Sequence, residues 1–314
     1  MKNKNKRNVS IKRIVSALLS ASLLFAVTSC GKKAKTKTGL IIYDGQFSEM
    51  KIIHRMVKHL VEDQTDLTVE LRDEMSPVNN YNLLVDGGCD LMNSYDGTLL
   101  TTYLKMDPLD VPEDMSLYDF ANQQAMERSS VRLLDKMGID NTYAIAVPEA
   151  TAREYNLKTI SDLVAVAPEL TFGAEHEFFS EEGSMKYRPF TEHYGLDFKD
   201  SFPVDISLKY SAIEKNMFDV TEVYATDGLN RKANLVLLED DKNYFPEYNG
   251  ALLVRDDLFE EVKETAPDLE EVLNGLGGTL TNEKMTDMSY AVDIEGKSVD
   301  DVAIQFLQEV SLID

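Results

Sequence analysis

The segment CDLMNSYDGTLL (residues 89–100) is informative about the fold, because a second segment, FDVTEVYATDGL (residues 218–229), repeats its pattern. Each segment contains an Asp, a short strand, a tyrosine five residues after that Asp, and then an Asp and a Gly that are typical of a turn. The two tyrosines are Tyr95 and Tyr224. The same unit at two places in one chain predicts two similar lobes, each with a tyrosine at the end of a strand.

The repeated unit belongs to a chain that alternates strands and helices from Gly39 onward. Apolar runs predict strands, and Ser48 is expected to cap a helix whose apolar residues recur at helical spacing. We therefore predict an α/β fold with largely parallel sheets, in which ligands bind beyond the carboxyl ends of the strands. Two lobes that face each other would enclose a central ligand cleft. Further predicted strands are TGLIIYDG (38–45), LTVEL (67–71), TYAIAV (142–147), LTFGA (170–174), DISLKY (205–210) and NLVLLE (234–239).

Composition and motifs narrow the function. The chain has 314 residues and a formal net charge of −23, which argues against a nucleic-acid partner because phosphates would be repelled. It carries no Gly-rich phosphate loop, no HExxH, no GxSxG and no Cys/His spacing for a metal. We therefore expect that the protein is not an enzyme and that it has no cofactor and no metal site. The histidines are expected at the surface; they are His54, His59, His176 and His193.

The first residues predict export and a membrane anchor. A basic start, MKNKNKRNVSIKR, precedes the apolar run IVSALLSASLLFAV, which is typical of a secretory signal and short for a membrane span. Thr28 and Ser29 stand directly before Cys30, as in the lipobox of bacterial lipoproteins. We expect residues 1–29 to be the signal peptide, Cys30 to be lipidated and residues 30–38 to be a tether. The other cysteine, Cys89, is expected to be a small buried side chain.

Four tyrosines near strand ends suggest the chemistry of the ligand. They are Tyr95 in NSYDGT, Tyr143 in NTYAIAV, Tyr224 in EVYATDG and Tyr248 in FPEYNGA. Singly, each tyrosine fits the core or the rim of a site. Together around one cavity, their ring faces would suit a quaternary ammonium, which has no N–H to donate and is attracted by aromatic rings at about 0.5–2 kcal/mol per ring.

The residues from Gly39 to Ile313 resemble the substrate-binding proteins of bacterial ABC transporters for glycine betaine, choline and carnitine, the osmoprotectant-uptake family. The matching segments include FSEM (residues 47–50), CDLMNSYDGT, LTFGAEHEF, LVLLEDDKNYFPEYNGALLVR and SYAVDIEGKSVDDVAIQFL. The resemblance implies a type II periplasmic-binding-protein fold with a hinge between two lobes. It also implies a solute receptor, anchored by lipid on the extracytoplasmic side of the membrane, that delivers its ligand to an ABC permease.

The resemblance assigns ligand-binding roles to individual residues. The four tyrosines match the family's ammonium cage, and Thr98 matches a threonine that binds the polar tail of the ligand. Ser76 matches a polar residue in the loop after the second strand. Where relatives carry Lys or Gln to reach a ligand carboxylate, this chain has Gly45, with Gln46 one place later. Asp96 is a second departure from the family pattern, in the turn after the first cage tyrosine.

These departures favour choline over glycine betaine as the ligand. Asp44 and Asp96 are expected to face the cleft, where a carboxylate repels a ligand carboxylate and can accept a hydrogen bond from a hydroxyl. Thr98, Gln46 and backbone N–H groups leave a betaine carboxylate as the alternative. We expect one lobe from residues 39–141 and 246–314 and the other from residues 142–245. The protein is expected to be a monomer, and a sensory or enzymatic two-lobed protein for the same ligand class is the alternative function.

Overall fold

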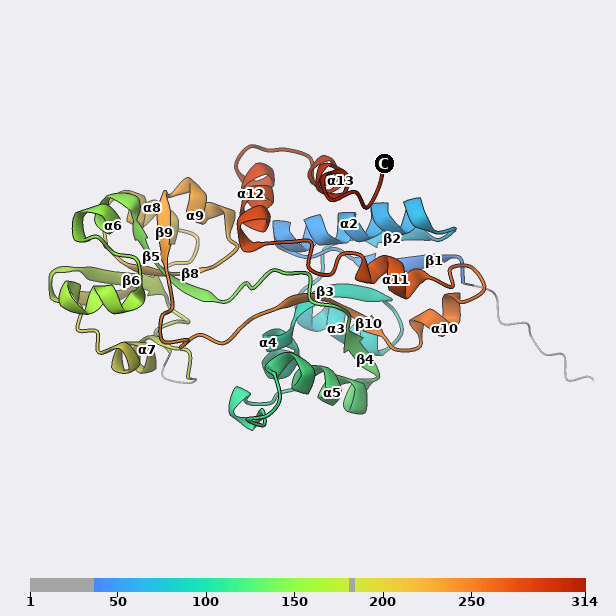
Figure 1. The fold of residues 1–314 in the computed structure, drawn as a ribbon, viewed down its shortest axis with the longest axis horizontal. Helices are drawn as coiled ribbons and strands as arrows, with labels where there is room; N and C mark the ends of the chain where they lie inside the picture. The colour runs from blue at the N-terminus through green and yellow to red at the C-terminus, as the bar shows by residue number, and fades with distance from the viewer. Residues whose placement is uncertain (1–36, 181–183) are drawn as a thin grey trace, which may run out of the picture. The chain divides into compact units, whose positions relative to one another are not determined.

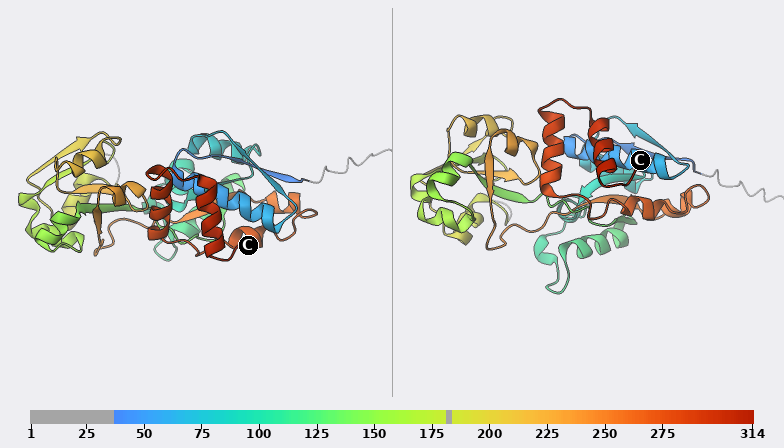
Figure 2. Two further views of the ribbon diagram at one scale, coloured as in Figure 1. Left: turned by 90° about the horizontal axis from the view of Figure 1, so that it is seen from above. Right: turned by 45° about the horizontal axis from the view of Figure 1, so that its top comes forward.

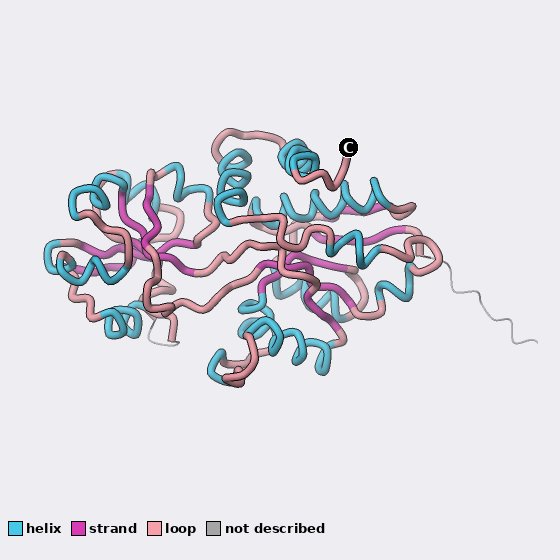
Figure 3. Tube along the Cα trace, in the orientation of Figure 1, coloured by secondary structure: helices cyan, strands magenta, loops and turns pink. Residues whose placement is uncertain are grey.

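The computed structural model describes residues 37–180 and 184–314, and the strands within them form four sheets. The sheets fall into two groups, seen on the right and on the left in Figure 1. In each group the strands lie inside and the helices lie outside (Figure 3). The first group holds β1 (Gly39–Tyr43), β2 (Thr68–Arg72), β3 (Leu91–Tyr95), β4 (Val131–Leu133) and β10 (Gly250–Arg255). The second holds β5 (Tyr143–Pro148), β6 (Thr171–Glu175), β7 (Asp200–Val204), β8 (Thr221–Tyr224) and β9 (Leu235–Leu238).

The first group is built from both ends of the described chain. Helix α2 (Ser48–Gln64) buries Ile52, Ile53, Met56, Val57, Leu60 and Val61, which recur at helical spacing and enter the same core as the C-terminal helices. Helices α12 (Asn282–Asp293) and α13 (Val299–Glu309) pack against α2, as both views of Figure 2 show. The other helices of this group are α3 (Pro77–Val85), α4 (Asp96–Thr98), α5 (Leu117–Ser129), α10 (Leu258–Val262) and α11 (Leu269–Asn274). Short π and 3₁₀ turns cover Leu99–Tyr103 and Pro108–Asp110.

The second group has an aromatic core. Phe172, Phe178 and Phe190 are fully buried in it, and their rings contact one another at centroid distances of 6.0–6.4 Å. Aromatic side chains bury large areas, so a few of them stabilise a small lobe. The helices are α6 (Glu149–Tyr155), α7 (Tyr187–Tyr194), α8 (Lys209–Glu214) and α9 (Gly228–Lys232), with 3₁₀ turns at Ile160–Ala165 and Ala167–Glu169.

The expectation of largely parallel sheets is wrong. Only the pairs β1–β2 and β6–β7 run parallel among the strand pairs of the described residues, whereas β10 pairs antiparallel with β3 and β4, and β5 pairs antiparallel with β8 and β9. The reason is the crossing of the chain between the groups. Strands β3 and β8 end near the cavity described below. Strands β5 and β10 begin near the same cavity, just after the chain has crossed from one group to the other. Strand β5 therefore runs antiparallel to β8, and β10 runs antiparallel to β3.

The strand predicted at residues 205–210 is also wrong. Strand β7 ends at Val204, and residues 206–208 form a turn before α8. The carboxylate of Asp205 accepts a 2.9 Å hydrogen bond from the backbone N–H of Ser207. Such a local bond from an Asp side chain competes with sheet pairing, and it overrides the alternation of apolar residues at this point.

The repeated segments play the same structural part in both groups. The carboxylate of Asp90 accepts a hydrogen bond of 2.8 Å from the N–H of Ile41 in β1, and the carboxylate of Asp219 accepts one of 2.9 Å from the N–H of Thr171 in β6. Each aspartate therefore fastens the strand that carries a tyrosine to the neighbouring strand. The prediction of two similar lobes from this repeat agrees with the two groups of sheets.

Candidate binding site

One cavity of about 930 Å³ is lined by residues from both groups of sheets. All four sequence-predicted tyrosines line it, and each is partly exposed. Thr98 and Gln46 line it as well. The structure therefore brings together six of the predicted site residues, which come from segments distant from one another in the chain.

Antiparallel pairing places two of the tyrosines side by side. Tyr143 begins β5 and Tyr224 ends β8, and the register sets them directly opposite each other. Their ring centroids are 5.3 Å apart at an angle of 44°. Phe178 and Phe245 meet the ring of Tyr143 edge-on, at 5.8 and 6.1 Å, and support it. These contacts restrict the first pair of rings before any ligand arrives.

The other two tyrosines form a matching pair in the first group. Tyr95 ends β3 opposite Gly250, and Tyr248 lies two residues before Gly250. The two rings are stacked, with centroids 5.2 Å apart. A Cβ atom on Gly97 would lie 2.2 Å from the ring of Tyr248, so glycine is required there for the ring to approach. The hydroxyl groups of Tyr248 and Thr98 are 2.5 Å apart, which fixes the position of both side chains.

Glu49 is a site residue that sequence reasoning did not identify. It lies in the first turn of α2, is buried, and lines the cavity. One carboxylate oxygen accepts from the hydroxyl of Tyr95, and the other accepts from the hydroxyl of Thr226 at 2.5 Å. Burial raises the pKa of Glu49, and the nearby charge of Asp227 adds to the rise. The segment FSEM was recognised, but only the tertiary contact gives its glutamate a role.

Asp96 does not face the cavity, and the expectation that it does is wrong. The side chain is fully buried, and its carboxylate accepts hydrogen bonds from the backbone N–H of Gly97 at 2.7 Å and from the backbone and side-chain N–H groups of Asn249 at 2.9 and 2.8 Å. Burial raises the pKa of Asp96 to about 6. These hydrogen bonds connect Asp96, in α4, to Asn249, the residue after Tyr248. The donors around the carboxylate come from the protein itself.

Asp44 is likewise turned away from the cavity. It accepts a 3.0 Å hydrogen bond from Arg55 and lies 3.3 Å from the ring of His54. Although burial alone would raise it, the hydrogen bond from His54, together with the charge and hydrogen bond of Arg55, holds the pKa of Asp44 below its usual value. Because Asp44 and Asp96 both interact with other groups of the protein and do not face the cavity, their charges give no reason to expect choline rather than glycine betaine.

Ser76 and Gln46 differ in their relation to the cavity. Ser76 precedes α3 as its N-cap and is not among the lining residues, although its neighbour Pro77 is. Gln46 is exposed at the rim. A Cβ atom at Gly45 would lie 2.4 Å from the Cβ of Met50, so a longer side chain at this position would displace α2.

His54 is buried, which contradicts the expected surface position. Its Nε2 accepts a 3.0 Å hydrogen bond from the N–H of Asn93, a residue of β3 beside Tyr95. The helical face of α2 explains the error, because His54 is in line with the buried Val57 and Val61. Cys89 is buried as expected, and burial raises the pKa of its thiol to about 11.

The charges around the cavity favour a cation. Among the residues that line it, carboxylates outnumber basic groups: the acidic ones are Glu49, Asp107, Asp227, Glu247 and Asp293, and the basic one is Lys186, which is paired with Glu177 at 3.0 Å. Burial raises the pKa of all four tyrosines, so their phenols are neutral and present ring faces and hydroxyl groups. Neutral rings with carboxylates nearby are suited to a cation without N–H groups.

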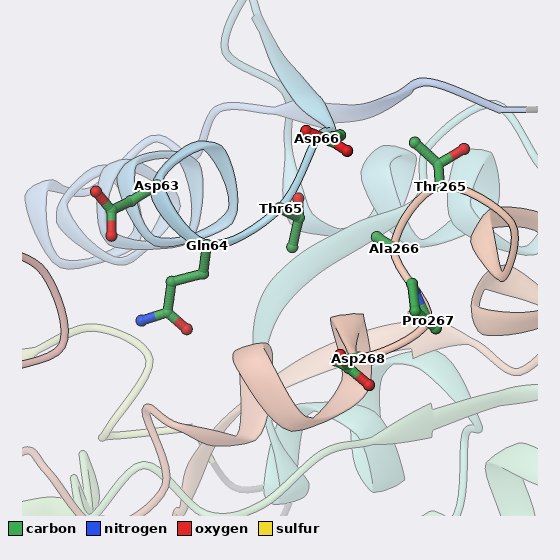
Figure 4. A pocket seen from close by; sticks show the side chains of 8 residues that line it. All are labelled: Asp63, Gln64, Thr65, Asp66, Thr265, Ala266, Pro267 and Asp268. Carbon is green, nitrogen blue, oxygen red and sulfur yellow. The ribbon is translucent and has the colours of Figure 1, made fainter.

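Other features of the described residues do not compete with this site. A smaller hollow of about 280 Å³ lies between the end of α2 and the turn at residues 265–268, and it has no aromatic ring (Figure 4). Within residues 37–180 and 184–314, no group of three or more His, Cys, Asp or Glu residues is placed to hold a metal ion. No helix in that part of the chain has the length and apolar character to cross a membrane. The predicted signal peptide and Cys30 lie outside the described residues.

Comparisons with known proteins identify related chains. Residues 40–309 match the family described as the substrate binding domain of ABC-type glycine betaine transport systems. The carnitine transport binding protein OpuCC of Listeria monocytogenes is 33% identical over 301 residues, which cover 94% of this chain and 95% of that protein. A glycine-betaine-binding protein of Pseudomonas aeruginosa is 30% identical over 239 residues, covering 73% of this chain and 74% of the relative.

A solved structure has the same fold. The crystal structure of a glycine betaine/carnitine/choline ABC transporter protein superimposes with a TM-score of 0.80 at 29% sequence identity. The superposition covers 89% of this chain and all of that one. The two groups of sheets with a cavity between them are therefore the arrangement of this class of two-lobed binding proteins.

Proposed function

The chain belongs to the family of substrate-binding domains of ABC-type glycine betaine transport systems, and on this basis we propose that its tyrosines hold a quaternary ammonium compound for uptake. Proteins of this family act outside the cytoplasm and work with a membrane permease. The observation that carries the proposal is that Tyr95, Tyr143, Tyr224 and Tyr248 line one cavity as two ring pairs, one from each lobe.

The ring geometry supports an ammonium head group between the lobes. Each ring attracts a desolvated cation by about 0.5–2 kcal/mol, so four rings supply a large part of the roughly 8 kcal/mol that a micromolar site needs. Because two rings come from each lobe, a ligand in contact with all four stabilises the lobes in a closed arrangement. Hinge closure around a ligand is the motion expected of this class of protein.

The polar tail of the ligand is proposed to lie near Thr98. Its hydroxyl lies beside that of Tyr248 and lines the cavity, and Gln46 is at the rim. Choline, glycine betaine and carnitine share the trimethylammonium head and differ in this tail. The relatives named for carnitine and for glycine betaine support a ligand of this class.

The organisation of the chain completes the proposal. We place the lobe boundaries at residues 141/142 and 245/246, which leaves two crossings as the hinge. The protein is proposed to act as a monomer that carries ligand to its permease without chemical turnover, and lipidation at Cys30 would keep it at the outer face of the membrane.

Titration calorimetry with choline, glycine betaine, carnitine and proline betaine tests the ligand class. We expect saturable binding of at least one of them, and each Tyr→Ala variant at the four positions should weaken it by about 1–2 kcal/mol or more. Phe variants should retain much of the affinity because the ring remains. Tyr155→Ala is the matched control, since Tyr155 lies on α6 and does not line the cavity. Wild-type affinity in two of the four Ala variants would contradict the cage.

A further inference from the structure

Three ionisable side chains are buried behind the tyrosine pair of the second lobe. Lys209, Glu222 and Glu175 are only 1%, 0% and 4% exposed, and none of them lines the cavity. They come from the start of α8, from β8 and from the end of β6, all in the second group of Figure 1. Burying charge is costly unless it is compensated, so apolar residues would serve packing better at these positions.

The buried groups touch or adjoin the cage ring of Tyr224. The hydroxyl of Tyr224 donates a 3.2 Å hydrogen bond to one oxygen of Glu175. Glu222 precedes Tyr224 by two residues on β8 and therefore lies on the same face of the strand. The ammonium of Lys209 lies 3.4 Å from a carboxylate oxygen of Glu222 and 5.7 Å from the centroid of the Tyr224 ring.

The negative charge of this group exceeds its positive charge. Two carboxylates face one ammonium, and one oxygen of each carboxylate has no hydrogen-bond partner. After burial, the charges of Glu222 and Glu175 are the main reason that the pKa of Tyr143 is raised. They also contribute, after burial and Tyr143 itself, to the raised pKa of Tyr224. A field that opposes a negative charge on these two rings favours a positive charge in front of them.

We propose that Glu175 and Glu222, held in place by Lys209, form an anionic support beneath the Tyr143–Tyr224 pair and give the site its preference for a cationic head group over a neutral one of the same shape. The inference rests on the proposed function, because it concerns how the same cage discriminates between ligands. Both glutamates are positioning residues that act through the rings and through space, since neither lines the cavity.

Pairs of ligands that differ only in charge test this proposal. Glycine betaine and 3,3-dimethylbutanoate have the same shape, with N(CH₃)₃⁺ in one and C(CH₃)₃ in the other, and choline and 3,3-dimethylbutan-1-ol form a second pair. The quantity measured is the ratio of the two dissociation constants within a pair, by calorimetry or by displacement of the bound cation. Because burial raises the pKa of Glu222 to about 7, the titrations are made at pH 8.

Glu175→Gln keeps the shape of the side chain and an oxygen for the Tyr224 hydroxyl while it removes one charge. We expect this variant to reduce the preference for the trimethylammonium ligand on the order of tenfold in each pair and to leave the affinity for the uncharged 3,3-dimethylbutan-1-ol within about twofold. Glu222→Gln should act in the same direction and serves if the first variant does not fold. Glu154→Gln is the matched control, because it removes a carboxylate from an exposed position on α6 of the same lobe that does not line the cavity.

The double variant Lys209→Met/Glu222→Gln removes an ion pair as a unit, so the net charge of the buried group is unchanged and the cation preference should persist. Equal losses for the cation and its neutral counterpart in Glu175→Gln would indicate a merely structural role and overturn the inference. An unchanged ratio in both single variants would overturn it as well. A wild-type protein that binds no trimethylammonium ligand would instead refute the proposed function.

Discussion

The carboxylate of Glu49 accepts a 2.5 Å hydrogen bond from the hydroxyl of Thr226, and this bond joins the two lobes. Glu49 belongs to α2 of the first group of sheets, whereas Thr226 follows β8 of the second. The other oxygen of Glu49 accepts from Tyr95, one of the cage rings. A single buried carboxylate therefore links the position of a ring to the approach of the lobes.

Replacement of Thr226 tests this link. Thr226→Val keeps the shape of the side chain but removes the donor, so the buried carboxylate of Glu49 loses one partner. Hydrogen bonds to charged groups contribute about 1.5–3 kcal/mol, and we expect ligand binding to weaken about tenfold or more. Thr226→Ser, which keeps the hydroxyl, should bind nearly as well as the wild type in calorimetry. Equal affinities for the Val variant and the wild type would show that the bond does not contribute to closure.

Gly97 is expected to be intolerant of a side chain for a reason specific to the site. In Gly97→Ala the new Cβ would meet the ring of Tyr248 at 2.2 Å and disturb its stacking on Tyr95. We expect a loss of affinity comparable to that of Tyr248→Ala. Gly88→Ala is the control, because its nearest contact is the flexible end of Leu83 at 3.0 Å, away from the cavity. Normal binding by the Gly97 variant would mean that the ring can move without cost.

Asp96 is expected to make the stability of the protein depend on pH. Its pKa is about 6 in the folded state, above the ordinary value of 3.8, so between these values the folded state binds more protons than the unfolded state. The free energy of unfolding contributed by this group is therefore highest below pH 3.8 and falls as the pH rises to about 6. The fall is on the order of 2–3 kcal/mol.

Urea unfolding of Asp96→Asn between pH 4 and pH 7 checks this expectation. The variant cannot ionise at this position, and rotation of the Asn249 amide can restore the hydrogen bonds. We expect the difference in unfolding free energy between variant and wild type to shift in favour of the variant as the pH rises. Asp114→Asn is an exposed control. A difference that stays constant over the whole range would rule out the effect.

Cys30 is expected to anchor the protein. Cys30→Ala removes the only thiol of the TSC sequence, so lipidation should be abolished and the protein should move from the membrane fraction to the soluble fraction. Fractionation after washing without detergent, followed by mass measurement of the mature N-terminus, provides the test. Membrane association that persists in the variant would exclude the lipobox interpretation.

The sequence was sufficient to predict the α/β class, the two lobes and the four tyrosines that line the cavity. These rest on local patterns: apolar strands, helical spacing and a repeated Asp–strand–tyrosine–turn unit whose two aspartates, Asp90 and Asp219, make equivalent hydrogen bonds. Local spacing cannot give strand direction, however. The antiparallel pairing that sets Tyr143 opposite Tyr224 follows from where the chain crosses between the lobes, which is a property of the whole fold.

The amino-acid sequence specifies which residue types are available for the site, whereas packing in the folded chain selects those that face the cavity. Asp96 and Glu49 illustrate the difference, because both are carboxylates next to recognised motifs. Asp96 finds N–H donors of Gly97 and Asn249 within the protein and turns inward, whereas Glu49 meets Tyr95 and Thr226 at the cavity. A buried carboxylate must have donors, and the position of those donors is set by packing between segments that are distant in the chain.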